Sequence, residues 1–180
     1  RFGSAVAFAS SGGLADLTLV DTTAIELASV TLSGNLSVTA SGAITDSGNL
    51  VITGTTTLAA GSGNNITLNT AGNNFTGAVI ITSGKDVALD HANAIVVGTS
   101  TVSGDLSVTT SGAITDSGAL AVTGASTLAA GSGNNITLDT GSNDFTGAVL
   151  VTSGNDVTLV DADALVLGAS SVSGKLSENS

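Results

Sequence analysis

The sequence predicts an all-β protein, a parallel β-helix built from tandem repeats, and three observations support this class. A segment of about 70 residues occurs twice in succession with no gap. Within it, apolar and polar residues alternate over four to six positions, as in Leu36-Ser37-Val38-Thr39, which indicates strands with one buried face. Ser-Gly, Thr-Gly and Gly-Ser-Gly-Asn-Asn separate these strands so closely that no helix fits between them.

The repeat sets the predicted organisation of the chain. Ser33–Val102 is one unit and Ser103–Val172 is the next, with about two-thirds of the positions identical, as expected for duplication of one structural unit. Residues 1–32 form a partial repeat that continues the solenoid, and residues 173–180 are the start of a next repeat or a truncated end. We therefore expect the chain to start and stop inside a longer polypeptide. Arg1 to Ser10 lack the charged and long apolar regions of a signal peptide.

Differences between the two copies predict which side chains are inside. Apolar positions exchange only for apolar residues of similar volume, which a packed interior tolerates: Ile80 for Leu150, Ile81 for Val151, Ile95 for Leu165 and Val97 for Leu167. Polar positions vary freely and are expected outside: Asn35 and Asp105, Asn69 and Asp139, Lys85 and Asn155, His91 and Asp161.

A stacked coil accounts for strands this short and regular. We expect about three strands per turn and ~23 residues per turn, so each repeat would hold about three turns and the chain would form a rod of ~35–40 Å. Phe75 and Phe145 would fill equivalent interior slots, and Asn64, Asn65, Asn73 and Asn74 would lie at turns, where amides bond from turn to turn. A β-sandwich with long tandem repeats is the alternative fold.

Composition excludes several functions. The 180 residues carry 3 Lys and Arg against 14 Asp and Glu, a net charge of −11, so binding to nucleic acid or to an anionic membrane surface is not expected. The absence of Cys excludes disulfides and thiolate chemistry. The absence of Pro suits uninterrupted strand ladders. No apolar run approaches the ~18 residues of a membrane span, so we expect no membrane insertion.

Two sequence blocks carry a family resemblance. The pattern Leu-Ser-Val-Thr-x-Ser-Gly-Ala-Ile-Thr-Asp-Ser-Gly-x-Leu at 36–50 and 106–120, and Asn-Asp-Phe-Thr-Gly-Ala-Val at 143–149, resemble the repeats of filamentous-haemagglutinin-like exoproteins. These are large bacterial adhesins, many exported by two-partner secretion. The resemblance implies a right-handed parallel β-helix and a secreted or cell-surface location. The secretion domain of that family has no counterpart in this sequence.

No set of residues predicts catalysis, so we expect the protein not to be an enzyme and assign no catalytic, cofactor-binding or metal residue. Asp46 and Asp116 are equivalent, and three turns would separate them by ~14 Å, more than the ~5–9.5 Å of glycosidase carboxylate pairs. Asp86 and Asp156 follow the same logic, and all four are expected to be turn-forming, solvated aspartates. His91 has Asp21 and Asp161 as its counterparts, so no function of the imidazole is retained between copies.

Binding motifs are equally incomplete. Gly61–Ile66 and Gly154–Val157 resemble half of a calcium-binding nonapeptide, which leaves a weak Ca²⁺ contact open as the alternative to having no cofactor. Asp161 and Asp163 form an acidic pair without a third partner. Gly-Ser-Gly-Asn-Asn lacks the Lys of a phosphate loop. Thr55–Thr57 and Thr67 do not continue as the array that ice binding needs, and the lack of Trp and Tyr argues against a lectin groove.

These observations favour a structural function. The leading hypothesis is a shaft segment of a secreted or surface-anchored bacterial adhesin, which presents or spaces binding regions. The runner-up is a self-assembling extracellular fibre or matrix subunit that stacks end to end, and a β-helix carbohydrate-active enzyme is third. The expected partners are neighbouring repeats of the same or identical chains and a host or bacterial surface.

Overall fold

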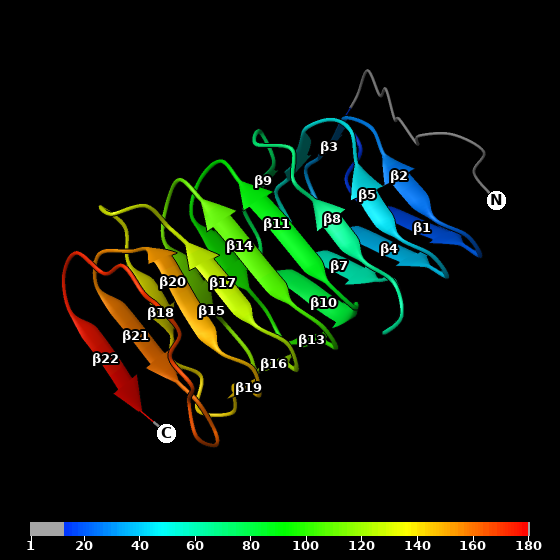
Figure 1. Ribbon diagram of the computed structural model, residues 1–180. Helices are drawn as coiled ribbons and strands as arrows, with labels where there is room; N and C mark the ends of the chain where they lie inside the picture. Colours follow the sequence, from blue (N-terminus) through cyan, green and yellow to red (C-terminus); the bar gives the residue numbers. More distant parts are fainter. Residues whose placement is uncertain (1–12, 180) are drawn as a thin grey trace.

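The computed structural model describes residues 13–179, and this part of the chain is built from 22 strands with turns between them (Figure 1). The expectation about a signal peptide at Arg1 to Ser10 lies outside the described residues. No helix occurs between residues 13 and 179, so none there could cross a membrane.

Two long parallel sheets make up most of the molecule. The nine-stranded sheet contains, in spatial order, β1 (Leu17–Asp21), β4 (Leu36–Ala40), β7 (Thr56–Ala59), β10 (Val79–Ser83), β12 (Ile95–Val97), β15 (Ile114–Asp116), β18 (Ile136–Leu138), β21 (Val157–Val160) and β22 (Leu176–Asn179). The seven-stranded sheet contains β2 (Ile25–Leu27), β5 (Ile44–Asp46), β8 (Ile66–Leu68), β11 (Val87–His91), β14 (Leu106–Thr110), β17 (Ser126–Ala129) and β20 (Val149–Ser153).

Two short parallel sheets complete the coil. One contains β3 (Val30–Leu32), β6 (Leu50–Ile52) and β9 (Asn74–Phe75), and the other contains β13 (Ser100–Val102), β16 (Leu120–Val122) and β19 (Asp144–Phe145). Most turns thus have three strands, as predicted, whereas the turn of β10 and β11 has two.

The chain passes alternately through the two long sheets and forms a β-solenoid, which confirms the predicted fold class. In Figure 1 the strands stack side by side from β1 and β2 near one end to β22 at the other. The eight spacings between the nine strands of the longer sheet correspond to a length of ~38 Å.

The predicted turn length was wrong. Between β1 and its equivalent in the next repeat, β11, the chain crosses from one long sheet to the other seven times. One repeat therefore makes three and a half turns of about 20 residues each, where the sequence suggested about three turns of ~23 residues. Register partners confirm the shorter spacing, because Leu17 pairs with Leu36 and Leu36 pairs with Thr56. Short strands joined by equally short corners make the coil this tight.

The core lies between the long sheets as columns of in-register apolar side chains. Ile25, Ile44, Ile66 and Val87 form one such column in the seven-stranded sheet. Phe75 and Phe145 are 1% and 2% exposed, so both fill the interior as predicted.

Copy comparison identified most interior positions correctly. Ile81, Val151, Ile95 and Val97 are buried, and Leu165 and Leu167 pack partly buried against the core. Ile80 and Leu150 depart from the prediction, since they alternate with buried neighbours and lie outside, over Gly98 and Gly168.

Candidate functional site

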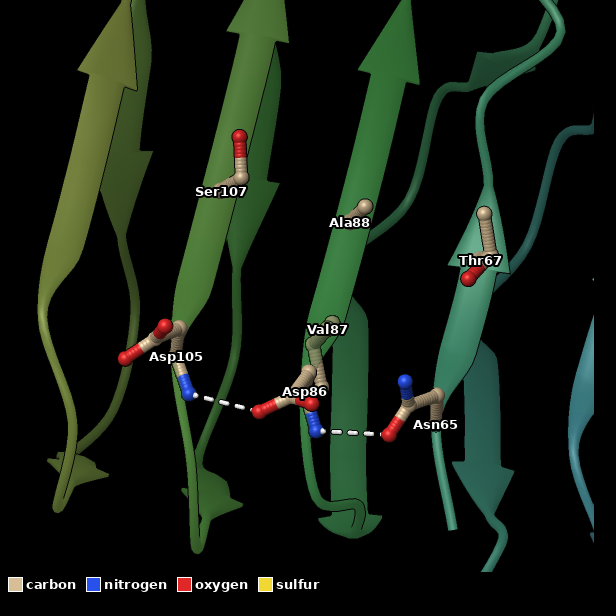
Figure 2. A pocket seen from close by; sticks show the side chains of 7 residues that line it. All are labelled: Asn65, Thr67, Asp86, Val87, Ala88, Asp105 and Ser107. Carbon is tan, nitrogen blue, oxygen red and sulfur yellow. Dashed lines mark hydrogen bonds between the residues drawn. The ribbon is translucent and has the colours of Figure 1, made fainter.

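A shallow hollow lies on the outer face of the seven-stranded sheet. Its volume is about 270 Å³, and β8, β11 and β14 with the residues just before them supply its lining: Asn65, Thr67, Asp86, Val87, Ala88, Asp105 and Ser107 (Figure 2). Ala88 is in register with Thr67 on one side and with Ser107 on the other. The small methyl side chain between two longer hydroxyl side chains creates the depression.

The rim of the hollow is a column of polar residues that each precede a strand. The N–H of Asp86 donates to Asn65 Oδ1 at 3.3 Å, and the N–H of Asp105 donates to Asp86 Oδ1 at 3.2 Å (Figure 2). The column continues when Ala125 donates its N–H to Asp105 Oδ1 at 2.8 Å. These oxygens therefore join each turn to the next at the corner of the coil.

The electrostatics of the rim follow from these contacts. The hydrogen bond from the Asp105 N–H lowers the pKa of the Asp86 carboxyl below its usual 3.8, and the neighbouring Lys85 ammonium lowers it further. Lys85 Nζ lies 3.4 Å from Asp86 Oδ2. Asp86 is thus a structural carboxylate that stays ionised, which is the opposite of what a general acid needs.

The hollow offers hydrogen-bonding groups without a reactive set. Its lining has two carboxylates, one amide and two hydroxyls, and Oδ1 of each carboxylate accepts a backbone N–H at the rim. Within residues 13–179, no group of three His, Cys, Asp or Glu side chains converges in a way that could hold a metal ion.

Asp46 and Asp116 organise turns, and their relative placement corrects the prediction. Asp46 accepts hydrogen bonds from the N–H of Asn69 at 3.0 Å, the N–H of Thr70 at 3.3 Å and Nδ2 of Asn73 at 2.6 Å. Asp116 makes the equivalent three contacts one repeat later. Asp46 lies in the seven-stranded sheet and Asp116 in the nine-stranded sheet, so the two do not lie three turns apart on one face. Both are half-buried and hydrogen-bonded, where solvated side chains were predicted.

Asn73 bonds from turn to turn as the sequence predicted, and Asn143 makes the same bond one repeat later. Asn73 and Asn143 are fully buried, and each Oδ1 accepts a backbone N–H from the preceding turn, Leu50 at 2.8 Å and Leu120 at 2.9 Å. Together with Asp46 and Asp116, they replace backbone partners at a corner of the coil. Asparagine occurs at this position in both copies of the repeat, and this retention is the feature of the sequence that indicates the role. The expected bonds between turns are also made by Asn65, whereas Asn64 bonds within its own turn, to the carbonyl of Ala60.

His91 and Asp161 correct the expectation that this position is exposed and has no retained role. They are 3% and 4% exposed. His91 Nε2 accepts the N–H of Phe75 at 2.6 Å, and Asp161 Oδ1 accepts the N–H of Phe145 at 3.2 Å. An imidazole and a carboxylate thus perform one structural task, which is to accept a buried N–H.

The remaining motifs form turns. Gly61 and Gly131 have positive φ angles of 81° and 83°, a backbone conformation that favours glycine, so these segments need glycine for their turn. Asp156 accepts the N–H of Lys175 at 2.9 Å. Asp161 is buried while Asp163 is exposed, so the acidic pair does not converge.

Comparison with known protein families gives a match that covers most of the chain. A family model described as repeats of unknown function (DUF5649) matches residues 14–82, 84–152 and 154–180. Successive matches begin 70 residues apart, which is the period of the sequence repeat. The matches begin at residues 14, 84 and 154, whereas the repeat units defined from the sequence begin at Ser33 and Ser103. No curated protein and no solved structure matches the chain.

Proposed function

The chain belongs to the family of repeats of unknown function (DUF5649), and from its architecture we propose that it is a structural shaft segment of a secreted or cell-surface bacterial adhesin. In this function the rod presents or spaces binding regions that lie elsewhere. The observation that carries the proposal is the continuity of the nine-stranded sheet, which runs from β1 to β22, and of the single core cluster beside it, which runs from Leu19 to Leu159. Fold alone does not specify function, so the proposal needs a direct experimental test.

The connections between turns support a mechanical function. Each turn pairs with the next in both long sheets, and side chains before the strands add further links. Asp16 Oδ1 accepts the N–H of Asn35 at 2.6 Å, and Asn35 Oδ1 accepts the N–H of Thr55 at 2.8 Å. Such a stack resists bending because many short contacts would have to change together. The net charge of −11 disfavours lateral association of identical rods.

Small-angle X-ray scattering tests whether the repeat extends a rigid rod. A variant with a second copy of residues 84–153 inserted after residue 153 should gain ~17 Å in maximum dimension, which is three and a half strand spacings, at an unchanged cross-section. A thicker particle without added length would contradict a shaft. Antibodies against the chain should label intact cells of the source bacterium. Labelling that requires lysis would contradict the surface location.

A self-assembling extracellular fibre subunit is the second candidate, and one observation favours it. β22 has β21 as its partner among the described strands, and all four of its side chains are exposed, including Leu176 at 42%. An edge of this kind accepts a further strand. Electron microscopy and sedimentation of the purified chain separate the two functions, because a shaft segment gives single short rods and a fibre subunit gives filaments that lengthen with concentration.

A carbohydrate-active enzyme is the least favoured function. Turnover of a polysaccharide that is abolished by Asp46→Asn or Asp116→Asn, with folding retained, would overturn the non-enzymatic proposal. The proposed partners are neighbouring repeats and a host or bacterial surface, without nucleic acid or membrane insertion. Calorimetric titration with Ca²⁺ tests the weak contact at Gly61–Ile66 and Gly154–Val157.

A further inference from the structure

Equivalent residues of successive repeats lie on opposite faces of the rod. Ser37, Ser107 and Ser177 occupy the same position in three successive copies of the repeat. Ser37 lies in β4 of the nine-stranded sheet, Ser107 in β14 of the seven-stranded sheet and Ser177 in β22 of the nine-stranded sheet. The cause is that one repeat makes three and a half turns, so each repeat ends half a turn away from where it began.

The residues around these serines make the same contacts on each face of the rod. In the middle copy the N–H of Asp105 bonds to Asp86 Oδ1, and in the last copy the N–H of Lys175 bonds to Asp156 Oδ1. The strand pairing is also repeated, since Leu106 pairs with Val87 and Leu176 pairs with Val157. The two broad faces of the rod therefore carry copies of one surface in alternation.

The short sheets alternate in the same way. The sheet of β3, β6 and β9 connects strands of the seven-stranded sheet to strands of the nine-stranded sheet, whereas the sheet of β13, β16 and β19 makes the reverse connection. One repeat therefore thickens one edge of the rod and the next repeat thickens the opposite edge.

We propose that successive sequence repeats are related by a half-turn about the rod axis, so that each repeat displays its surface on the broad face opposite to that of the repeat before it. Insertion or deletion of one repeat would then rotate the rest of the rod beyond it by half a turn. Copies on the same face are seven turns apart, or ~34 Å, so a bivalent partner on one face must span that distance. The alternation follows from strand order, so it holds whether the rod is a shaft or a fibre subunit.

The junction between repeats allows a repeat to be removed cleanly. Ser83 Oγ accepts the N–H of Gly61 at 3.1 Å, and Ser153 Oγ accepts the N–H of Gly131 at 3.1 Å. The residues just beyond also match, since Lys85 N–H donates to the Asn64 carbonyl and Asn155 N–H donates to the Asn134 carbonyl, both at 2.7 Å. Deletion of residues 84–153 joins Ser83 to Gly154 and restores the native sequence pattern at the junction.

Disulfide trapping in this deletion variant tests the proposal, because the chain has no native cysteine. In the full chain Thr67 lies in the seven-stranded sheet and Thr158 in the nine-stranded sheet. In the deletion variant Thr158 takes the position of Ala88, directly opposite Thr67. Neighbouring strands are ~4.8 Å apart, within the Cα separation of ~4.4–6.8 Å that a disulfide allows. Thr67→Cys with Thr158→Cys should cross-link in the deletion variant and not in the full chain.

Two controls make the result decisive. Thr137→Cys with Thr158→Cys should cross-link in the full chain, where these residues are register partners. Cross-linking of Ile80→Cys with Thr158→Cys in the deletion variant, in place of Thr67→Cys with Thr158→Cys, would overturn the half-turn geometry, because Ile80 lies on β10, the last strand of the nine-stranded sheet before the deletion.

Spin labels provide a test that does not depend on the folding of the deletion variant. In the full chain, labels at Ser37→Cys and Ser177→Cys should be ~34 Å apart on one face. Labels at Ser37→Cys and Ser107→Cys should be well over ~20 Å apart, because ~17 Å along the axis and ~10 Å between sheets already separate the backbones by ~20 Å. Both labels also project outward from their sheets. A distance of ~14–19 Å for that pair would mean a whole number of turns and would overturn the proposal.

Discussion

The backbone N–H of Phe75 donates to the imidazole Nε2 of His91, and the two rings stack with their centroids 5.6 Å apart. Phe75 belongs to β9, the last strand of its short sheet, and the next turn has no strand at that edge to accept the N–H. The acceptor role of Nε2 places the imidazole proton on Nδ1, which lies 2.9 Å from the carbonyl oxygen of Asn93. His91 therefore closes the end of the short sheet.

Substitution of His91 should reveal this role. His91→Leu should lower the free energy of unfolding by about 1–3 kcal/mol, because a buried N–H loses its acceptor. His91→Asp should retain most of the stability, since Asp161 accepts the N–H of Phe145 in the following copy. Urea unfolding measures both effects, and hydrogen exchange at the Phe75 amide localises them. Equal losses in the two variants would show that ring packing, and not the hydrogen bond, is the function of His91.

A buried hydroxyl should be replaceable with a gain in stability. Thr56 is fully buried, and among the described residues its Oγ1 has no hydrogen-bond partner. Thr56→Val keeps the shape and removes the unpaired polar group, so it should raise the free energy of unfolding by about 1 kcal/mol. Thr57→Val on the outward side of the same strand is the control and should change stability by less than about 0.5 kcal/mol. A loss of stability in Thr56→Val would indicate that the hydroxyl is satisfied.

The corners of successive turns stack so closely at Gly124 that any larger residue there should destabilise the fold. A Cβ added to Gly124 would lie 2.6 Å from the carbonyl carbon and the carbonyl oxygen of Gly104 in the preceding turn. Backbone cannot move aside without breaking the ladder, so Gly124→Ala should destabilise by about 1–3 kcal/mol. Gly133→Ala is the matched control, because a Cβ at Gly133 has no atom within 4 Å. Thermal unfolding of both variants checks the difference, and similar midpoints would contradict the close approach.

The sequence patterns predicted the coil but not the number of residues in each of its turns. Alternation in segments such as Leu36–Thr39 and the exchange of Ile81 for Val151 correctly indicated strands with one buried face. The number of residues per turn depends on how sharply each corner bends, which the alternation of apolar residues does not encode. His91 was placed outside because polar exchange normally indicates exposure. Acceptance of one buried N–H is a task that either an imidazole or a carboxylate performs, so that exchange was misleading here.

The pH dependence of stability should show the environment of Asp90. Burial raises the pKa of the Asp90 carboxyl above its usual 3.8, and the negative charge of Asp46 raises it further, while a hydrogen bond with Thr109 opposes both effects. A carboxyl whose pKa is raised by folding contributes stability that is fully present below pH 3.8 and is lost as the pH rises through the folded-state pKa. Asp90→Asn removes this penalty, so it should raise the unfolding temperature at pH 7 relative to the native chain and leave it nearly unchanged at pH 3.

Asp86 provides a control of opposite sign, because the N–H of Asp105 lowers its pKa. Its contribution is present above pH 3.8 and is lost as the pH falls through the folded-state pKa, so Asp86→Asn should lower the unfolding temperature at pH 7 and have a smaller effect at pH 3. Differential scanning calorimetry of the native chain and the two variants at both pH values measures the four differences. If Asp90→Asn and Asp86→Asn shift the unfolding temperature at pH 7 in the same direction, net charge dominates, and the local contacts of these two carboxylates do not control the pH dependence.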